Sequence, residues 1–413
     1  MKYFLPFVGC VLISLPGLTQ RDCRSFDYRQ QQLSADPSLA AKVEAVEQFT
    51  HMQLHRSSVT ITGEGGKETI PAIITIPVVV HIVYNTTSQN ISDAQIASQL
   101  DVLNADYGKH NADTTAIPGY YAGLAADCGI RFVLAGADTS GHATTGIVRT
   151  HTSATSFSLN DDVKFGARGG DDAWDRDRYL NIWVCNLSGD VLGYSSLVGG
   201  QKATDGVVIK YTALGTKGTA LSPYNRGRTA THEVGHWLNL IHVWGDAPCG
   251  DDQVGDTPPQ QQATYGDPSG IVVSCNNAPY GNLYMNYMDF TDDIGMHLFT
   301  GGQRDRMRVL FADGGFRHVL LASPAAVAAT QTQGSGATMV VSMSIYPNPT
   351  MNSATVRMAE VGSVLGIYNM MGGRVMSVRV TQATVQLDLS GLAGGIYFVR
   401  QDGKSGGARV VKL

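Results

Sequence analysis

The sequence has 413 residues and a formal net charge of −5 at pH 7. This length exceeds what one ordinary hydrophobic core fills, so we expect two or three structured units. The mild charge gives no indication of nucleic acid or of an anionic membrane surface as a partner, and no segment after the N-terminus has the roughly 20 apolar residues of a membrane-spanning helix.

Residues 1–19 are typical of a signal peptide. Lys2 is followed by a mainly apolar run from Phe4 to Leu15, which is too short to span a membrane. A lipid anchor at Cys10 is a weaker interpretation, because Phe7 stands where a small aliphatic residue is usual. We therefore expect a secreted or cell-surface protein.

Residues 20–56 differ in composition from the chain beyond Ile73. The stretch Leu33 to Gln53 is rich in Ala, Gln, Glu and Leu, and Asp36-Pro37 is a helix-start signal. The segment is polar and short for a domain. A helical pro-segment is the natural interpretation of such a piece after a signal peptide.

Residues 57–322 are expected to form a domain of the α+β class. The β-branched run from Ile76 to Tyr84 predicts a buried strand, and apolar residues at helical spacing predict a helix from Ser92 to Tyr107. Four further strands are expected at Ile130–Leu134, Gly146–Thr150, Tyr179–Cys185 and Thr204–Ile209. A helix is expected over residues 225–242, then about fifty residues with little periodicity, then a helix from Thr300 to Leu321.

The helix at 225–242 carries a metal-binding pattern. His232 and His236 are four residues apart, so they share one helical face and can reach one ion, with Glu233 beside them. His242 is too far along for a continuous helix to present it on that face. Asn239 offers a break, because Asn tolerates the left-handed conformation.

Three neutral histidines and one water form the open coordination of catalytic zinc. Zinc would lower the pKa of that water, and Glu233 would take its proton and later deliver it to the leaving amine. The alternative is a chance match in a helix that contains histidine. The third histidine and the break residue argue against it.

The stretch from His232 to His242 and the later Asn286-Tyr-Met-Asp-Phe290 resemble the pappalysin family of metzincins, particularly its ulilysin- and cytophagalysin-like members. The resemblance implies a twisted mixed sheet with a zinc-binding helix, and a Met-turn at Met288, whose plainer interpretation is a core methionine. Phe290 departs from the family, which has a tyrosine there that is thought to assist the transition state. Met296 stands where members that cleave before Arg carry an acidic residue, so a basic preference is not supported.

The exported chain keeps five cysteines once Cys10 is removed. A bridge between Cys249 and Cys275 would close a loop of about 26 residues and contribute about 3 kcal/mol; the alternative is two free thiols. Cys128 and Cys185 are expected either to pair with each other or to be buried thiols.

The same loop has the oxygen-rich composition of a calcium site. Family resemblance implies calcium ligands at Asp252, the Gly255 carbonyl, Thr257 and Asp267. The alternative is a solvated acidic loop.

Cys23 lies at the start of the pro-segment between Arg21 and Arg24, whose charges would favour a thiolate. The segment resembles the cysteine switch of bacterial pappalysins, although Arg24-Ser25 replaces the usual Gly-Thr. The resemblance implies that Cys23 occupies the fourth zinc position until cleavage near residues 55–57 releases the segment. The alternative is an unpaired or intermolecularly bridged cysteine.

A flexible linker is expected at 323–343, followed at 344–413 by short alternating strands that predict a small all-β, Ig-like sandwich. The segments Ser344–Pro349, Gly366–Gly373 and Gly394–Val399 resemble the type IX secretion sorting domain, which implies the type IX machinery as a partner. The alternative is an Ig-like binding module.

These features together predict a secreted zinc endopeptidase that acts on proteins or peptides and is made as a latent zymogen, with zinc and calcium as cofactors. The rival hypothesis is a surface adhesin with a catalytically silent zinc site. Glu233 favours the enzyme, because a structural zinc site needs no general base.

Overall fold

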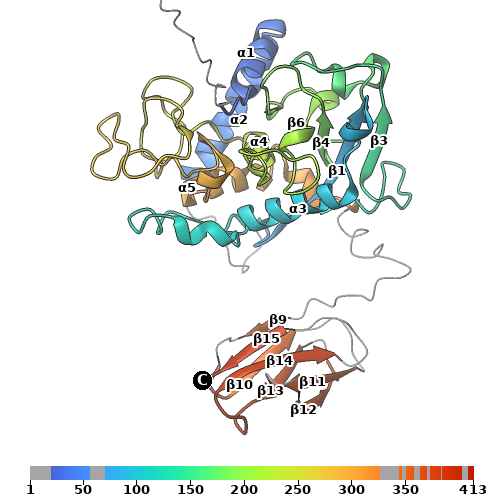
Figure 1. Ribbon diagram of the computed structural model, residues 1–413, viewed down its shortest axis with the longest axis vertical. Helices are drawn as coiled ribbons and strands as arrows, with labels where there is room; N and C mark the ends of the chain where they lie inside the picture. The colour runs from blue at the N-terminus through green and yellow to red at the C-terminus, as the bar shows by residue number, and fades with distance from the viewer. Residues whose placement is uncertain are drawn as a thin grey trace, which may run out of the picture. The chain divides into compact units, whose positions relative to one another are not determined.

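The computed structural model describes residues 20–55, 70–325, 344–346, 350–357, 363–369, 373–382, 384–401 and 408–413. The chain divides into two compact units, one up to Thr332 and one from Gln333 (Figure 1). The signal peptide, the expected activation site after His55 and most of the linker lie outside the described residues. The expected domain boundaries stay predictions.

The predicted pro-segment contains two helices, α1 (Ser25–Ala35) and α2 (Ser38–His55), drawn in blue in Figure 1. The chain breaks between them at Asp36, whose carboxylate accepts hydrogen bonds from the backbone and the hydroxyl of Ser38. An Asp before a helix satisfies otherwise unpaired N–H groups, which is why this pair separates the two helices.

A six-stranded mixed sheet forms the frame of the first unit. Its order is β2-β1-β4-β6-β5, with β3 also paired to β1, and every pairing is parallel except that of the edge strand β5. The strands are β1 (Ile74–Tyr84), β2 (Ile130–Leu134), β3 (Ile147–His151), β4 (Leu180–Cys185), β5 (Gly193–Ser195) and β6 (Val207–Lys210). The expected metzincin-type α+β fold is confirmed. The sequence analysis missed β5, which has only three residues.

Alternation along the central strands divides their side chains between the two faces of the sheet. Val78, Val80 and Ile82 of β1 join the main core, which also contains residues of α3 (Asp93–Tyr107) and α4 (Arg228–Trp237). Side chains of the opposite face pack in a second cluster that includes Tyr28 of α1. Helix α1 therefore packs against this face of the sheet.

The last helix of this unit is shorter than expected. α5 runs from Gly301 to Arg308, and Thr300 and Gln303 form the predicted capping box. Helical turns at Val309–Phe311 and His318–Ala322 are separated by a turn in which Gly314 has a φ of 74°. The prediction of one helix to Leu321 is wrong, because two successive glycines favour a turn over a helix.

Shorter elements connect these helices and strands. The two-stranded parallel sheet of β7 (Tyr265–Gly266) and β8 (Phe290–Thr291) lies in the long segment after α4. Other 3-10 helices lie at Thr87–Gln89, Ala112–Ala116, Asp162–Lys164, Gly166–Arg168, Lys202–Thr204, Tyr211–Ala213 and Asp293–Gly295.

The second unit is an all-β sandwich, as the sequence predicts. Its antiparallel sheets have the orders β13-β10-β9 and β12-β11-β14-β15. The strands are β9 (Ser344–Tyr346), β10 (Ser353–Arg357), β11 (Val364–Tyr368), β12 (Arg374–Arg379), β13 (Thr384–Asp388), β14 (Gly395–Gln401) and β15 (Ala408–Lys412). Alternate residues such as Val356, Ile367 and Val399 fill the core between the sheets. In the described parts of both units, no helix has the length and apolar character needed to cross a membrane.

Candidate metal centre

Helix α4 presents His232, Glu233 and His236 from the middle of the first unit. Its N-terminal end is anchored by Asp293, whose Oδ2 accepts hydrogen bonds from the backbone N–H groups of Arg226 and Arg228. A carboxylate at this position is stabilised by the unpaired N–H groups and by the helix dipole.

The chain reverses direction directly after the helix. Helix α4 ends at Trp237, and Asn239 adopts a φ of 70°, so the predicted left-handed break is confirmed. Arg306 of α5 donates from Nε to the Asn239 carbonyl at 2.8 Å, and the Leu240 N–H bonds back to the Gly235 carbonyl at 2.9 Å. This turn carries His242 back toward the helix.

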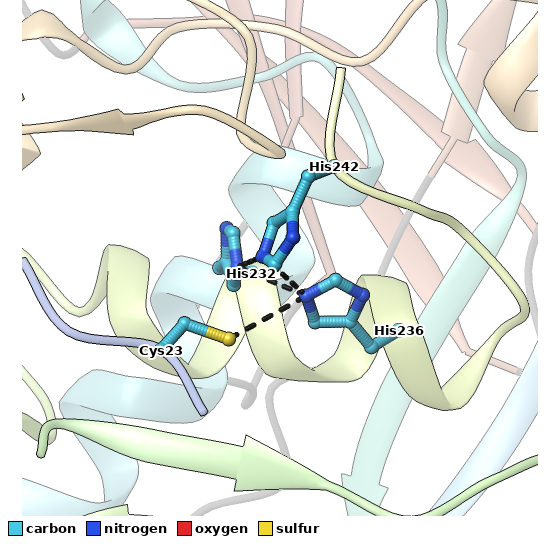
Figure 2. Close-up of side chains that lie close together, drawn as sticks. All are labelled: Cys23, His232, His236 and His242. Carbon is cyan, nitrogen blue, oxygen red and sulfur yellow. Dashed lines mark hydrogen bonds between the residues drawn. The ribbon is translucent and has the colours of Figure 1, made fainter. Parts of the chain in front are cut away.

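The three imidazoles converge on one point (Figure 2). The Nε2 atoms of His232 and His236 are 3.1 Å apart, those of His236 and His242 are 3.1 Å apart, and those of His232 and His242 are 3.3 Å apart. Cys23 Sγ lies 3.5 Å from His236 Nε2 and completes a group whose ligand atoms all lie within 4.8 Å of one another. One ion can therefore contact all four atoms.

The Nδ1 atoms of the three histidines are bonded in a way that leaves their Nε2 atoms available to a cation. The Nδ1 atoms of His232 and His236 bond to the carbonyls of Tyr287 (2.7 Å) and Leu240 (2.9 Å), and His242 Nδ1 bonds to Asp246. A carbonyl or carboxylate accepts, so each Nδ1 carries the proton and each Nε2 keeps its lone pair. Burial lowers the pKa of His232 and lowers that of His236 to about 3, which keeps these rings neutral. Three imidazoles whose Nε2 atoms converge in this way fit zinc.

Met288 and Phe290, which follow the long loop after α4, lie close to the metal group. Met288 packs beneath α4, where a Cβ atom built on Gly235 would lie 2.5 Å from its sulfur. The Phe290 ring lies 5.7 Å from the His232 ring and 4.9 Å from the His242 ring. The position where the family has tyrosine is therefore beside the metal group, but here it has no hydroxyl.

Glu233 is fully buried beside the histidines. Its Oε2 accepts a hydrogen bond from Ser25 Oγ at 2.7 Å, and its Oε1 has no partner among the described residues. Burial raises the pKa of Glu233 to about 7, which suits a group that takes and returns a proton near neutral pH. Ser25 belongs to the pro-segment, so that segment contacts both the metal group and the glutamate.

The pro-segment reaches this place along the edge strand β5. Arg24 N–H bonds to the Gly193 carbonyl at 3.1 Å, and Leu192 N–H bonds to the Asp22 carbonyl at 2.9 Å. Burial, with the nearby charge of Glu233, raises the pKa of the Cys23 thiol. The expectation that flanking arginines favour a thiolate is wrong, because Arg24 pairs with Asp22 and Asp27 and Arg21 pairs with Asp293.

The sequence analysis missed Asp293. Its fully buried carboxylate pairs with Arg21, which also donates from Nε to the Thr291 carbonyl at 3.0 Å and lies over the Tyr224 ring. Met296, the position expected to decide a preference for basic residues, is instead buried in the main core. The signal that could have identified the acidic residue is the Asp292-Asp293 pair shortly after Met288.

The remaining cysteines have definite states. Cys249 and Cys275 form the predicted disulfide, with Cα atoms 5.7 Å apart. Cys128 and Cys185 are free thiols in different core clusters, and burial raises the pKa of each. Of the two alternatives left open for this pair, buried thiols are correct.

Within the disulfide loop, Asp252 and Thr257 lie together. Thr257 Oγ1 is 2.9 Å from both carboxylate oxygens of Asp252, and the Val254 N–H bonds to Oδ1 at 3.1 Å. Asp267 lies beside Gly295. Two of the four expected calcium ligands are therefore in direct contact.

Comparison with known families gives two matches along the chain. The family described as pregnancy-associated plasma protein-A matches residues 167–312, and the secretion system C-terminal sorting domain matches residues 344–413. Among curated proteins, an extracellular metalloprotease of Pyricularia oryzae is 34% identical over 249 residues, covering 58% of this chain and 75% of the relative. One from Uncinocarpus reesii is 32% identical over 272 residues, covering 62% and 83%.

Two solved structures from Tannerella forsythia are similar. A promirolysin mutant is 42% identical with a TM-score of 0.67, and covers 76% of this chain and all of that chain (100%). Mature mirolysin in complex with a cleaved peptide is 48% identical with a TM-score of 0.60, and covers 64% of this chain and 99% of that chain.

Asp246 is expected to contribute to metal affinity, because its carboxylate accepts the hydrogen bond of His242 Nδ1. Asp246→Ala removes the acceptor that orients His242, so we expect zinc affinity to fall by about 10- to 100-fold. Competition with a chromogenic chelator on the full chain measures this change. The exposed Asp313→Ala is the matched control, and equal affinities in the two variants would contradict the orienting role.

Proposed function

Because this chain belongs to the pappalysin family of zinc metallopeptidases, we propose that it is an endopeptidase made as a latent zymogen. It is a secreted or cell-surface enzyme, in keeping with its sorting domain and its extracellular relatives. One observation supports latency above all others: Cys23 lies in the metal group while the neighbouring Ser25 bonds to Glu233.

In the active enzyme, His232, His236 and His242 would hold the zinc ion. Bound zinc supplies a Lewis acid and lowers the pKa of water. Glu233 would accept the proton of the attacking water at Oε1, the oxygen that has no partner among the described residues, and return it to the leaving amine. A binding module with a silent zinc site would not need this buried carboxylate, so the adhesin hypothesis is not favoured.

The pro-segment would block the site in two ways. The Cys23 sulfur would take the position of the attacking water, and the Ser25 hydroxyl would hold Glu233 through its other carboxylate oxygen, Oε2. The similar promirolysin structure aligns with a larger share of this chain than the mature form does, as expected if this chain also carries a removable pro-segment. We place the removal after His55.

We further propose that the enzyme accepts a basic side chain next to the scissile bond. Arg21 lies two residues from Cys23 and inserts into a buried site that ends at Asp293. Removing the segment would take this cation away and open the carboxylate to another side chain. A substrate Arg or Lys would restore the pair.

We propose that the C-terminal unit is the part of the chain that the type IX machinery recognises during export.

We also propose a calcium site in the disulfide loop. Its ligands would be Asp252, Thr257, the Gly255 carbonyl and Asp267, and bound calcium would stiffen the loop, because hard oxygen ligands suit this ion.

The central test compares the full chain and Glu233→Ala after zinc loading and limited proteolysis. The wild type is expected to cleave a denatured protein beside Arg or Lys, as read by mass spectrometry of the products, and Glu233→Ala is expected to lose at least about 1000-fold in rate. Asp293→Asn should retain cleavage but lose the basic preference.

If wild type and Glu233→Ala are equally inert while both hold zinc, the peptidase proposal fails. If Asp293→Asn keeps the wild-type cleavage profile, only the proposed basic preference fails.

The latency proposal predicts that Cys23→Ala speeds autoactivation of the zinc-loaded full chain, because water then has access to the metal. Gel analysis of the processing time course measures this effect. Ser34→Ala, on the exposed side of α1, is the control. Unchanged latency in Cys23→Ala would remove the thiol from the mechanism.

Calcium binding is expected to depend on pH. Burial raises the pKa of Asp252 to about 7, so a proton competes with the cation below that pH, and calcium affinity should fall as the pH decreases through 7. We expect calcium to raise the unfolding temperature more at pH 8 than at pH 6, and Asp252→Asn to abolish the difference. Asp251→Asn, on the exposed side of the loop, is the control; no calcium effect in the wild type at either pH would rule the site out.

A further inference from the structure

Phe290 places an aromatic ring without a hydroxyl group beside the metal group. Its ring contacts the rings of His232, His242 and Trp244, so the side chain after the Met-turn packs against two of the three imidazoles. A phenyl ring offers no hydrogen bond to a peptide in the cleft. If a side-chain hydroxyl bonds to a peptide beside Phe290, another residue has to supply that hydroxyl.

Tyr265 lies on the other side of Phe290. Strand β7 pairs in parallel with β8 so that Tyr265 is directly opposite Phe290, and their ring centroids are 5.9 Å apart. The Tyr265 side chain remains 40% exposed, whereas Phe290 is 8% exposed. Phe290 is thus sandwiched between the imidazoles and a phenol that faces solvent.

The backbone around Tyr265 is held in place by Asp289. Its Oδ1 accepts from the N–H groups of Thr264 (2.7 Å) and Phe290 (2.8 Å), and its Oδ2 accepts from Gln260 Nε2 (2.9 Å). The Gly266 carbonyl accepts from the Asp292 N–H at 2.7 Å. These bonds join the loop to the Met-turn segment and fix the backbone position of Tyr265 beside Phe290.

The Tyr265 phenol also lies near the segment that carries Cys23. Burial, and then the carboxylates of Asp22 and Asp289, raise the pKa of Tyr265. Asp22 directly precedes Cys23, so the phenol lies within electrostatic range of the chain that blocks the metal group. No hydrogen-bond partner for its hydroxyl is found among the residues that the structure describes.

We propose that Tyr265 is a substrate-binding residue whose hydroxyl donates a hydrogen bond to the peptide that replaces the pro-segment in the cleft. It supplies the phenol group that Phe290 lacks, from the loop closed by the Cys249–Cys275 disulfide rather than from the Met-turn itself. This role rests on the proposed peptidase function. It would give the site a phenol beside Phe290.

The test uses the full chain, loaded with zinc and activated, and a fluorogenic peptide containing one Arg. Tyr265→Phe keeps the ring contact with Phe290, so we expect an unchanged unfolding temperature and a kcat/KM about tenfold lower, the order of one lost hydrogen bond. In the inert Glu233→Ala background, the same substitution should weaken binding of the peptide by a similar factor, as measured by fluorescence anisotropy.

Phe290→Tyr in the Tyr265→Phe background should recover most of the loss, because it returns a phenol to the same wall. Tyr280→Phe is the matched control, since Tyr280 is also exposed but stacks on Tyr120. A kcat/KM for Tyr265→Phe within twofold of wild type, an equal loss in Tyr280→Phe, or no recovery by Phe290→Tyr would each overturn the proposal. If the wild type itself cleaves nothing, the peptidase function fails instead.

Discussion

The left-handed turn at Asn239 determines whether this chain has a metal site at all. Helix α4 can place only two histidines on one face, and the third has to return from outside the helix. A residue with a φ of 70° costs about 1–2 kcal/mol for most side chains and less for Asn. The turn is then held by Arg306 on the Asn239 carbonyl, so the geometry of the ligands depends on a residue far along the chain.

The predicted pro-segment is attached to the rest of the first unit by polar contacts at three places. Cys23 and Ser25 contact the metal group and its glutamate, Arg21 pairs with Asp293, and Glu47 forms a two-pronged ion pair with Arg306. The last contact connects α2 to the Asn239 turn, because the same arginine holds both. If the segment is released, Asp293 and Arg306 each lose their ion-pair partner, so the surface beneath it would offer charged groups to a ligand.

The region around Met288 and Phe290 shows how phenylalanine is accommodated at a position where the family has tyrosine. Phe290 keeps the ring that packs on the imidazoles and on Trp244, while the adjacent β7 places Tyr265 on its outer side. Asp289 connects the two segments through two hydrogen bonds, accepted from Gln260 Nε2 and the Thr264 N–H. The disulfide loop, which has little regular secondary structure, therefore contacts, through Tyr265, the ring that packs on the imidazoles.

The sequence alone was sufficient for features that depend on short-range spacing. Examples are the i, i+4 pair of His232 and His236, the break at Asn239, the capping box at Thr300 and the alternating strands of the C-terminal unit. The tertiary structure alone decided the contacts between distant residues: Asp293 as the partner of Arg21, Arg306 as the support of the Asn239 turn, and Tyr265 beside Phe290. Helical and strand periodicity operates over a few residues, whereas Arg21 and Asp293 are 272 positions apart. Their contact depends on the path of the pro-segment along β5, a three-residue strand too short to leave a periodic pattern in the sequence.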